Sequence, residues 1–166
     1  MDAYRAIISK RDRREYDSRR QIPEAVLARI LQAGRMAGSS SNSQPCRFVV
    51  LQDQANRDAL LPLGRGTAPL GRAPLVIAVL LQKGARDFDA GRAVQNMMVA
   101  AWAEGIINCP IGIQEREGAR KALRYPDGFE IAICVAFGYP DESQAAPARE
   151  PRPRLSLKEL VHRERW

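Results

Sequence analysis

Seven consecutive apolar residues, LVIAVLL at positions 75–81, constrain the fold more than any other feature of the sequence. A continuous apolar run of this length has no polar face, so it predicts a β-strand that is buried on both sides. The segments 47–52 and 129–138 also predict strands, and 107–113 predicts a short strand or a loop.

Helical segments separate these strands. The stretch that follows Pro23, a natural first residue of a helix, carries apolar residues at helical spacing. Shorter helices are expected at 2–9 (with Ala3, Ile7 and Ile8 inward), at 54–64 and at 115–123, and a Gly- and Pro-rich loop is expected at 64–74. This order indicates an α/β or α+β fold and leaves the sheet topology open.

The longest expected helix covers residues 89–105. It is apolar on most sides, through residues such as Val94, Met97 and Trp102, and Gly105 is a natural end for it. A helix that is apolar nearly all round lies in a large core or in a subunit interface. Because a chain of 166 residues has little room for a second interior, we expect an oligomer.

The C-terminal part of the chain has a different character. Four prolines and few apolar residues follow Tyr139, so residues 139–155 are expected to form an extended arm that reaches across a surface. A short helix then closes the chain, with Ser156 and Glu159 at the two positions of a capping box. The expected organisation is a single domain, 1–166, that carries this arm.

The charge is strongly basic, +7, and arginine supplies 22 of the 26 basic residues. Arginine binds phosphate and carboxylate groups through two parallel hydrogen bonds. The excess of arginine therefore fits three explanations: an anionic ligand, a nucleic-acid partner, or a basic surface that is merely solvated. With only 6% aromatic residues and no recognised nucleic-acid motif, we expect no nucleic-acid partner. Two basic clusters, 10–14 and 152–154, could meet at one phosphate only if the fold brings the chain ends together.

Several kinds of chemistry have no signature here. The three cysteines are isolated from one another and His162 is the single histidine, so neither a metal site nor a disulfide framework is expected. The sequence contains no dinucleotide-binding glycine motif, no phosphate-binding loop and no nucleophile elbow, so any enzymatic chemistry is expected to come from a cofactor. No apolar run approaches the roughly 20 residues of a membrane span, and no secretory signal opens the chain, so a cytoplasmic location without membrane contact is expected.

The polar stretch 39–45 (SSSNSQP) offers hydroxyl and amide groups that both donate and accept hydrogen bonds. Such a set suits a ligand edge with alternating donors and acceptors, as in the pyrimidine ring of a flavin. An ordinary surface turn explains the composition equally well.

Taken in order, several segments resemble the nitroreductase family of FMN-dependent oxidoreductases. They are KRDRREY (10–16), IPE (22–24), AGSSSNSQPC (37–46), APLVIAV (73–79), the helix from Asp89 to Gly105, GYP (138–140), and Arg152-Pro153-Arg154 ahead of the closing LKELVHRERW. Together they span nearly the whole chain.

The resemblance implies an α+β, nitroreductase-like FMN-binding fold whose central, mainly antiparallel sheet is flanked by helices. It also implies a homodimer in which the C-terminal tail reaches over the partner subunit and two FMN sites lie at the interface. The implied reaction is ping-pong hydride transfer: NAD(P)H reduces FMN and leaves, and a small-molecule acceptor such as a nitroaromatic or a quinone then takes the hydride. No protein side chain is assigned a catalytic role.

The same resemblance assigns the cofactor-binding positions. Lys10, Arg11, Arg152 and Arg154 would neutralise the phosphate, and Arg14 would lie toward the N1 and O2 edge of the flavin. Ser39, Ser40 and Asn42, from the other subunit, would meet the ring and the ribityl chain, with Gln44 on the ribityl side. The backbone of Pro110, Ile111 and Gly112 would face the flavin near N5.

Three positions depart from the family pattern. Asp12 replaces a serine and would repel a phosphate unless Arg11 or Arg14 pairs with it, Gly38 replaces a proline, and Cys46 replaces a tryptophan. These departures keep a second hypothesis open, a flavin-binding storage or sensing protein with little NAD(P)H turnover. The sequence leaves the acceptor undetermined and also admits a deazaflavin-linked or specialised metabolite.

Overall fold

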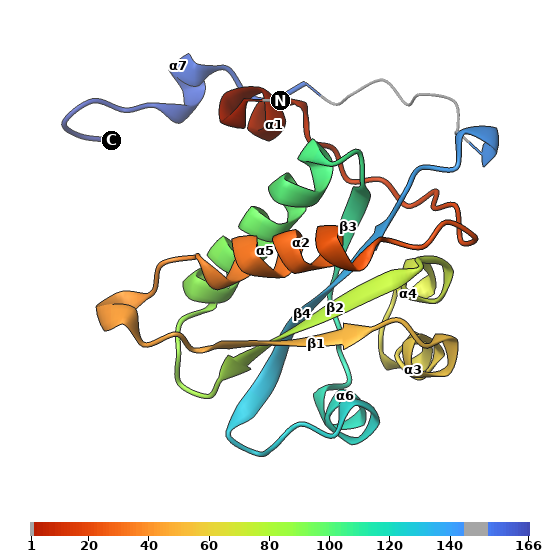
Figure 1. Cartoon of the computed structure of the whole chain (residues 1–166). Helices are drawn as coiled ribbons and strands as arrows, with labels where there is room; N and C mark the ends of the chain where they lie inside the picture. The colour runs from red at the N-terminus through yellow and green to blue at the C-terminus, as the bar shows by residue number, and fades with distance from the viewer. Residues whose placement is uncertain (1, 145–152) are drawn as a thin grey trace.

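A computed structural model describes residues 2–144 and 153–166 (Figure 1). The strands are β1 (Cys46–Leu51), β2 (Leu75–Gln82), β3 (Ile107–Ile111) and β4 (Phe129–Gly138). The helices are α1 (Ala3–Ser9), α2 (Glu24–Arg35), α3 (Gln54–Asp58), α4 (Ala68–Arg72), α5 (Asp87–Ala103), α6 (Arg116–Leu123) and α7 (Leu157–Leu160). Short 3-10 turns lie at η1 (Ser40–Asn42), η2 (Leu61–Leu63) and η3 (Glu142–Gln144). Across the two described ranges, no helix is long and apolar enough to cross a membrane.

The sheet has the strand order β1-β2-β4-β3, and each pair of neighbouring strands is antiparallel. The apolar run 75–81 forms the inner strand β2, in which each of these seven residues is buried. The prediction of a strand buried on both sides is confirmed, and so is the α+β class with its antiparallel sheet.

Two hydrophobic cores lie on opposite faces of this sheet because successive strand residues point to opposite sides. Leu75 and Ile77 of β2 pack with buried residues of α2 and α5, whereas Val76 and Ala78 belong to the core that contains Leu70. Figure 1 shows α2 and α5 together on one face, with α3, α4 and α6 at the other. The sheet thus forms the middle layer of the fold.

Helix α5 begins two residues earlier than expected and ends before Gly105, whose φ of +76° favours glycine. Its buried residues are Asp89, Ala90, Ala93, Val94, Met97, Met98 and Ala101. They pack against α2 and the sheet of the same chain. The intramolecular core therefore accounts for much of the apolar surface on which the expectation of an oligomer rested.

Three local expectations are wrong. Helix α1 buries Ala6 and leaves Ile7 and Ile8 57% and 52% exposed, because it meets the body through its Ala6 side and through Ser9, whose Oγ accepts a hydrogen bond from Trp102 Nε1. The segment 54–64 is divided into α3 and η2, since Pro62 cannot supply an N–H to a continuing helix. The expected loop 64–74 contains the short helix α4.

Helix α7 and the C-terminus lie away from the sheet (Figure 1). The closing helix is capped as expected: Ser156 Oγ accepts from Glu159 N, and Ser156 N donates to the Glu159 carboxylate. Much of the expected arm, residues 145–152, lies outside the described residues, so the course of the arm stays a prediction.

Candidate functional site

The basic segment after α1 is attached to strand β3. Arg13 N donates to Asn108 O at 3.1 Å, and Asp12 forms a parallel bridge with Asn108. The side chain of Asn108 is completely buried, and its Nδ2 donates to Met98 O of α5 at 3.0 Å. Residues 10–14 therefore run beside β3 and the C-terminal half of α5.

Within this segment, Lys10 and Asp12 form an ion pair. The Lys10 ammonium also lies 3.6 Å from Met98 Sδ, and its side chain is only 9% exposed, against 48% for Asp12. Arg11 Nη1 donates to Ile8 O and Lys10 O, both at 2.8 Å, at the end of α1. The sequence left open whether Arg11 or Arg14 pairs with Asp12; in the structure the ion pair of Asp12 is with Lys10.

The side chain of Arg14 lies beside Cys109 of β3. Burial raises the pKa of the Cys109 thiol, and the Arg14 guanidinium opposes this rise by favouring the thiolate. The nearby Tyr16 hydroxyl is buried and has no hydrogen-bond partner among the described residues, and burial raises its pKa strongly. A polar cavity of about 360 Å³ opens at this point, lined by Arg14, Glu15, Tyr16, Ser18, Gln54, Gly71, Arg72 and Gln144.

At the end of β3 the backbone becomes accessible. Ile111 is buried in the core and Pro110 is half-buried, whereas Gly112 is exposed, and a Cβ built on it would meet no atom within 4 Å. The following loop is fixed, because Gln114 N donates to Leu63 O at 2.9 Å. The chain thus presents an anchored stretch of backbone with open space above it, suited to a flat ligand that approaches closely.

The polar loop around η1 has a tightly folded backbone. Ser39 Oγ accepts from Gln44 N at 2.9 Å, and Gln44 Nε2 donates to Asn42 O at 3.3 Å. Asn42 and Gln44 have φ values of +54° and +50°, in a region that most non-glycine residues avoid. Strain of this kind is common at ligand-binding loops.

This loop lines a largely apolar groove of about 450 Å³ between α2, β1 and α5. Gly38, Ser39, Gln44 and Cys46 all contribute to the wall of the groove. Figure 1 shows η1 at the opposite end of the molecule from the segment that follows α1. Within one chain, the structure therefore brings residues 10–14 and 110–112 to the same strand but leaves residues 39–44 apart from them.

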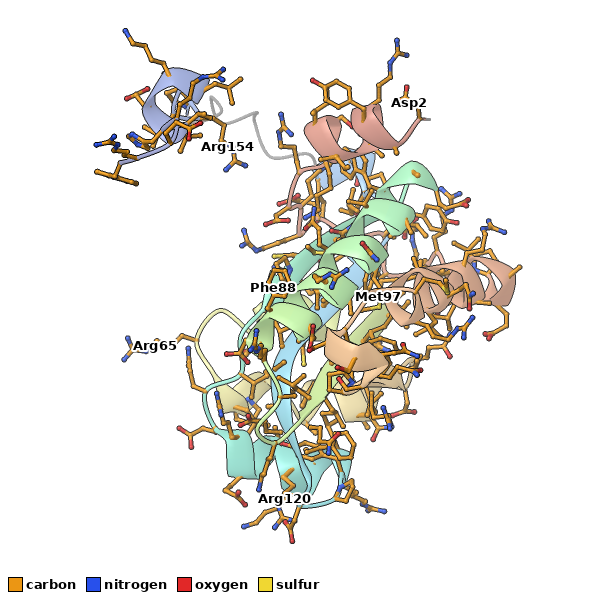
Figure 2. All side chains as sticks on the ribbon, turned by 90° about the vertical axis from the view of Figure 1, so that its left-hand side faces the viewer. Asp2, Arg65, Phe88, Met97, Arg120 and Arg154 are labelled. Atoms are coloured by element: carbon orange, nitrogen blue, oxygen red, sulfur yellow. The ribbon has the colours of Figure 1, made fainter. Side chains whose placement is uncertain are left out.

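The two tail arginines were expected to bind the phosphate. Arg154 is exposed on the tail and forms no ion pair with any residue of the described ranges (Figure 2). Arg152 lies outside the described residues. The convergence of both basic clusters on one phosphate stays a prediction.

Sequence reasoning missed two contributors to this region. Asn108 holds the basic segment against β3, and Arg72 lines the cavity beside Arg14. A signal existed for Asn108, because an amide inside an otherwise apolar strand needs internal hydrogen bonds. No signal existed for Arg72, one of many arginines, since only the packing of α4 places it there.

Comparison with known proteins agrees with this architecture. A family model described as "Nitroreductase family" matches residues 7–83 and 68–139. An NADH dehydrogenase from Thermus thermophilus is 27% identical over an alignment 197 residues long, which covers 95% of this chain and 96% of that protein.

Two solved structures share the fold at low sequence identity. A nitroreductase family protein from Clostridium difficile 630 is 22% identical, has a TM-score of 0.85, and the alignment covers 100% of both chains. An FMN-dependent nitroreductase from Clostridium difficile R20291 is also 22% identical, with a TM-score of 0.80 and coverage of 97% and 98%. These likenesses confirm the fold class expected from the sequence.

Proposed function

Because the chain belongs to the nitroreductase family and is an oxidoreductase, we propose that it binds FMN and uses NAD(P)H to reduce a small oxidised acceptor such as a nitroaromatic or a quinone. Bound FMN would supply the hydride chemistry, taking a hydride from NAD(P)H and giving it to the acceptor in a second half-reaction. The names of two similar proteins support this proposal: one is an NADH dehydrogenase and the other an FMN-dependent nitroreductase.

The residues present fit such a cofactor. FMN combines a phosphate with a flat ring that carries polar edges, so its site needs cations, a close backbone and polar groups. The segment 10–14 supplies cationic side chains, and the backbone at Gly112 lies open, because a Cβ built there would meet no atom within 4 Å. Both features lie at β3.

One observation carries the proposal: Arg13 N donates to Asn108 O and so fixes the basic segment against the strand that ends at Gly112. From this position, Lys10 and Arg11 would bind the phosphate together with Arg152 and Arg154 of the tail. Arg14 would lie toward the N1 and O2 edge of the flavin, and the backbone of 110–112 would face the ring.

The site is proposed to form between two copies of the chain. Residues 39–44 lie apart from residues 10–14 within one chain, so Ser39, Ser40, Asn42 and Gln44 would come from the partner subunit. Exposed apolar side chains on the tail favour the same arrangement; they are Leu155, Leu157, Leu160, Val161 and Trp166. Apolar side chains that are exposed on the tail of the single chain are suited to pack against a neighbouring subunit.

The role of the protein in this reaction is to bind, to orient and to exclude water. His162 lies in the exposed tail, where its ring stacks on Trp166, with the ring centres 4.1 Å apart. A general base at the flavin is not needed for hydride transfer. Cys46, in place of a bulky tryptophan, lines the groove beside η1 and would leave more space for an acceptor there.

The test is the visible absorption spectrum of the purified protein, repeated without oxygen after addition of NADPH or NADH. A yellow protein that bleaches supports the proposal. A yellow protein that keeps its colour supports a storage or sensing role instead. A colourless protein that takes up no added FMN contradicts the proposed cofactor.

A further inference from the structure

The ion pair between Lys10 and Asp12 neutralises one of the cations in the basic segment 10–14. Asp12 is the carboxylate that contacts the Lys10 ammonium within the described residues. The pair is held from both sides: the Asp12 backbone bridges to Asn108, and the Lys10 ammonium rests against Met98 Sδ at 3.6 Å. The Lys10 side chain is thus packed against the body, and the half-exposed Asp12 carboxylate covers its ammonium from the outside.

The other cations of the segment also have partners of their own. Arg11 donates to the backbone carbonyls of Ile8 and Lys10, and Arg13 Nε lies 3.8 Å from the Glu15 carboxylate. Arg14 lies beside Cys109. Lys10, whose ammonium is both shielded and already neutralised, is therefore the cation whose availability to an anion depends most directly on one carboxylate.

We propose that Asp12 is a specificity-determining residue: it acts as a built-in counter-ion for Lys10 and weakens the dependence of flavin binding on the phosphate group. A phosphate that approaches Lys10 must compete with a carboxylate already in contact with it and is also repelled by that carboxylate. The site consequently distinguishes FMN from unphosphorylated riboflavin only weakly. This inference rests on the proposed flavin site.

The Asp12 carboxylate competes well with a phosphate because Lys10 is shielded from water and the backbone of Asp12 is fixed. A charge pair near a protein surface interacts more strongly than the same pair in bulk water, and screening by salt is weaker for the shielded Lys10 than for an exposed lysine. Because the bridge to Asn108 fixes the backbone of Asp12, the carboxylate can leave Lys10 only by rotation of its own side chain. The cost of displacing it falls on the phosphorylated ligand alone.

The experiment compares the binding of FMN and of riboflavin to the flavin-free protein by fluorescence titration. The variants are Asp12→Ser, which introduces a small hydroxyl, and Asp12→Asn, which keeps the shape and removes the charge. Glu117→Gln is the matched control, because it makes the same change in net charge at a side chain 78% exposed on α6. Circular dichroism establishes that each variant is folded.

We expect FMN to bind both Asp12 variants about tenfold more tightly than the wild type, with riboflavin affinity unchanged within about twofold. Added salt should weaken FMN binding to the variants more steeply than to the wild type. Unchanged FMN affinity in both variants, or an equal gain for FMN and riboflavin, would overturn this inference while leaving the flavin site intact. Failure of the wild type and every variant to bind either flavin would overturn the proposed function itself, and this inference with it.

Discussion

A Cβ atom on Gly34 of α2 would lie 2.8 Å from Cγ of Met97 on α5. It would also lie 3.1 Å from Cζ of Phe48, so the two helices and strand β1 meet at this point. Met97 is completely buried and has no solvent-facing space into which it could turn. Glycine is therefore required here by the close approach of the helices and not by an unusual backbone angle.

Gly34→Ala should lower stability. Overpacking a core costs about 1–3 kcal/mol, which exceeds the gain of about 1 kcal/mol in helix propensity. Gly91→Ala on α5 is the matched control, since a Cβ at Gly91 meets no atom within 4 Å and should stabilise the helix. Urea denaturation measures both, and equal stabilisation by the two substitutions would contradict the packing argument.

Arg154→Ala should weaken FMN retention if the tail reaches a phosphate. Loss of one charge-assisted hydrogen bond typically costs about 1.5–3 kcal/mol. Arg163→Ala, in the same exposed tail but outside the basic pair at 152 and 154, serves as the control and should retain FMN normally. Equilibrium dialysis of FMN gives the comparison, and an unchanged Kd for Arg154→Ala would show that the tail points elsewhere.

Sedimentation velocity should report a dimer. Leu157→Glu places a charge on a residue 78% exposed in the single chain and should shift the equilibrium toward monomer if the tail covers the partner. Lys158→Gln makes the same change in net charge at the neighbouring residue and should leave the dimer intact. A stable, flavin-loaded monomer would refute the interface site.

Stability should decrease in alkaline solution because of Cys134. Burial raises the pKa of this thiol from 9.0 to about 12. The contribution of the buried, protonated thiol to the free energy of unfolding is therefore complete below pH 9 and is lost as the pH rises toward 12. Between pH 8 and pH 10, ionisation of the unfolded thiol should cost about 1.4 kcal/mol.

The measurement for Cys134 is urea denaturation of the wild type and of Cys134→Ala at both pH values. The variant lacks the thiol, so the stability difference between the two proteins should change by the predicted amount. A difference that is independent of pH would show that this thiol ionises as readily in the folded protein as in the unfolded chain.

The fold was more accessible to sequence reasoning than the site. The strand at 75–81 and the Ser156 cap depend on local patterns, an unbroken apolar run and a three-residue spacing, and both are confirmed. The inward face of α1 was assigned wrongly because a short helix with apolar residues on more than one side has no unique inner face. Ala6, which was not among the residues expected to point inward, is the residue that is buried.

The ion pair in the basic segment 10–14 could not be predicted from the sequence either. The sequence states that Asp12 stands among four basic residues but not which of them it meets. Asn108, almost a hundred residues away, fixes the backbone of the segment, and Met98 receives the Lys10 ammonium. The choice of Lys10 follows from these two distant contacts.

By itself, then, the sequence determined the strands and the longer helices, because hydrophobic periodicity and caps are properties of neighbouring residues. Its motif order indicated the family and, through the family, the antiparallel α+β class. Only the tertiary structure decided which charges pair, where the backbone lies open at Gly112, and that residues 39–44 and 10–14 of one chain stay apart. Those features depend on contacts between residues distant in the chain, whose energies are set by packing and burial rather than by local composition.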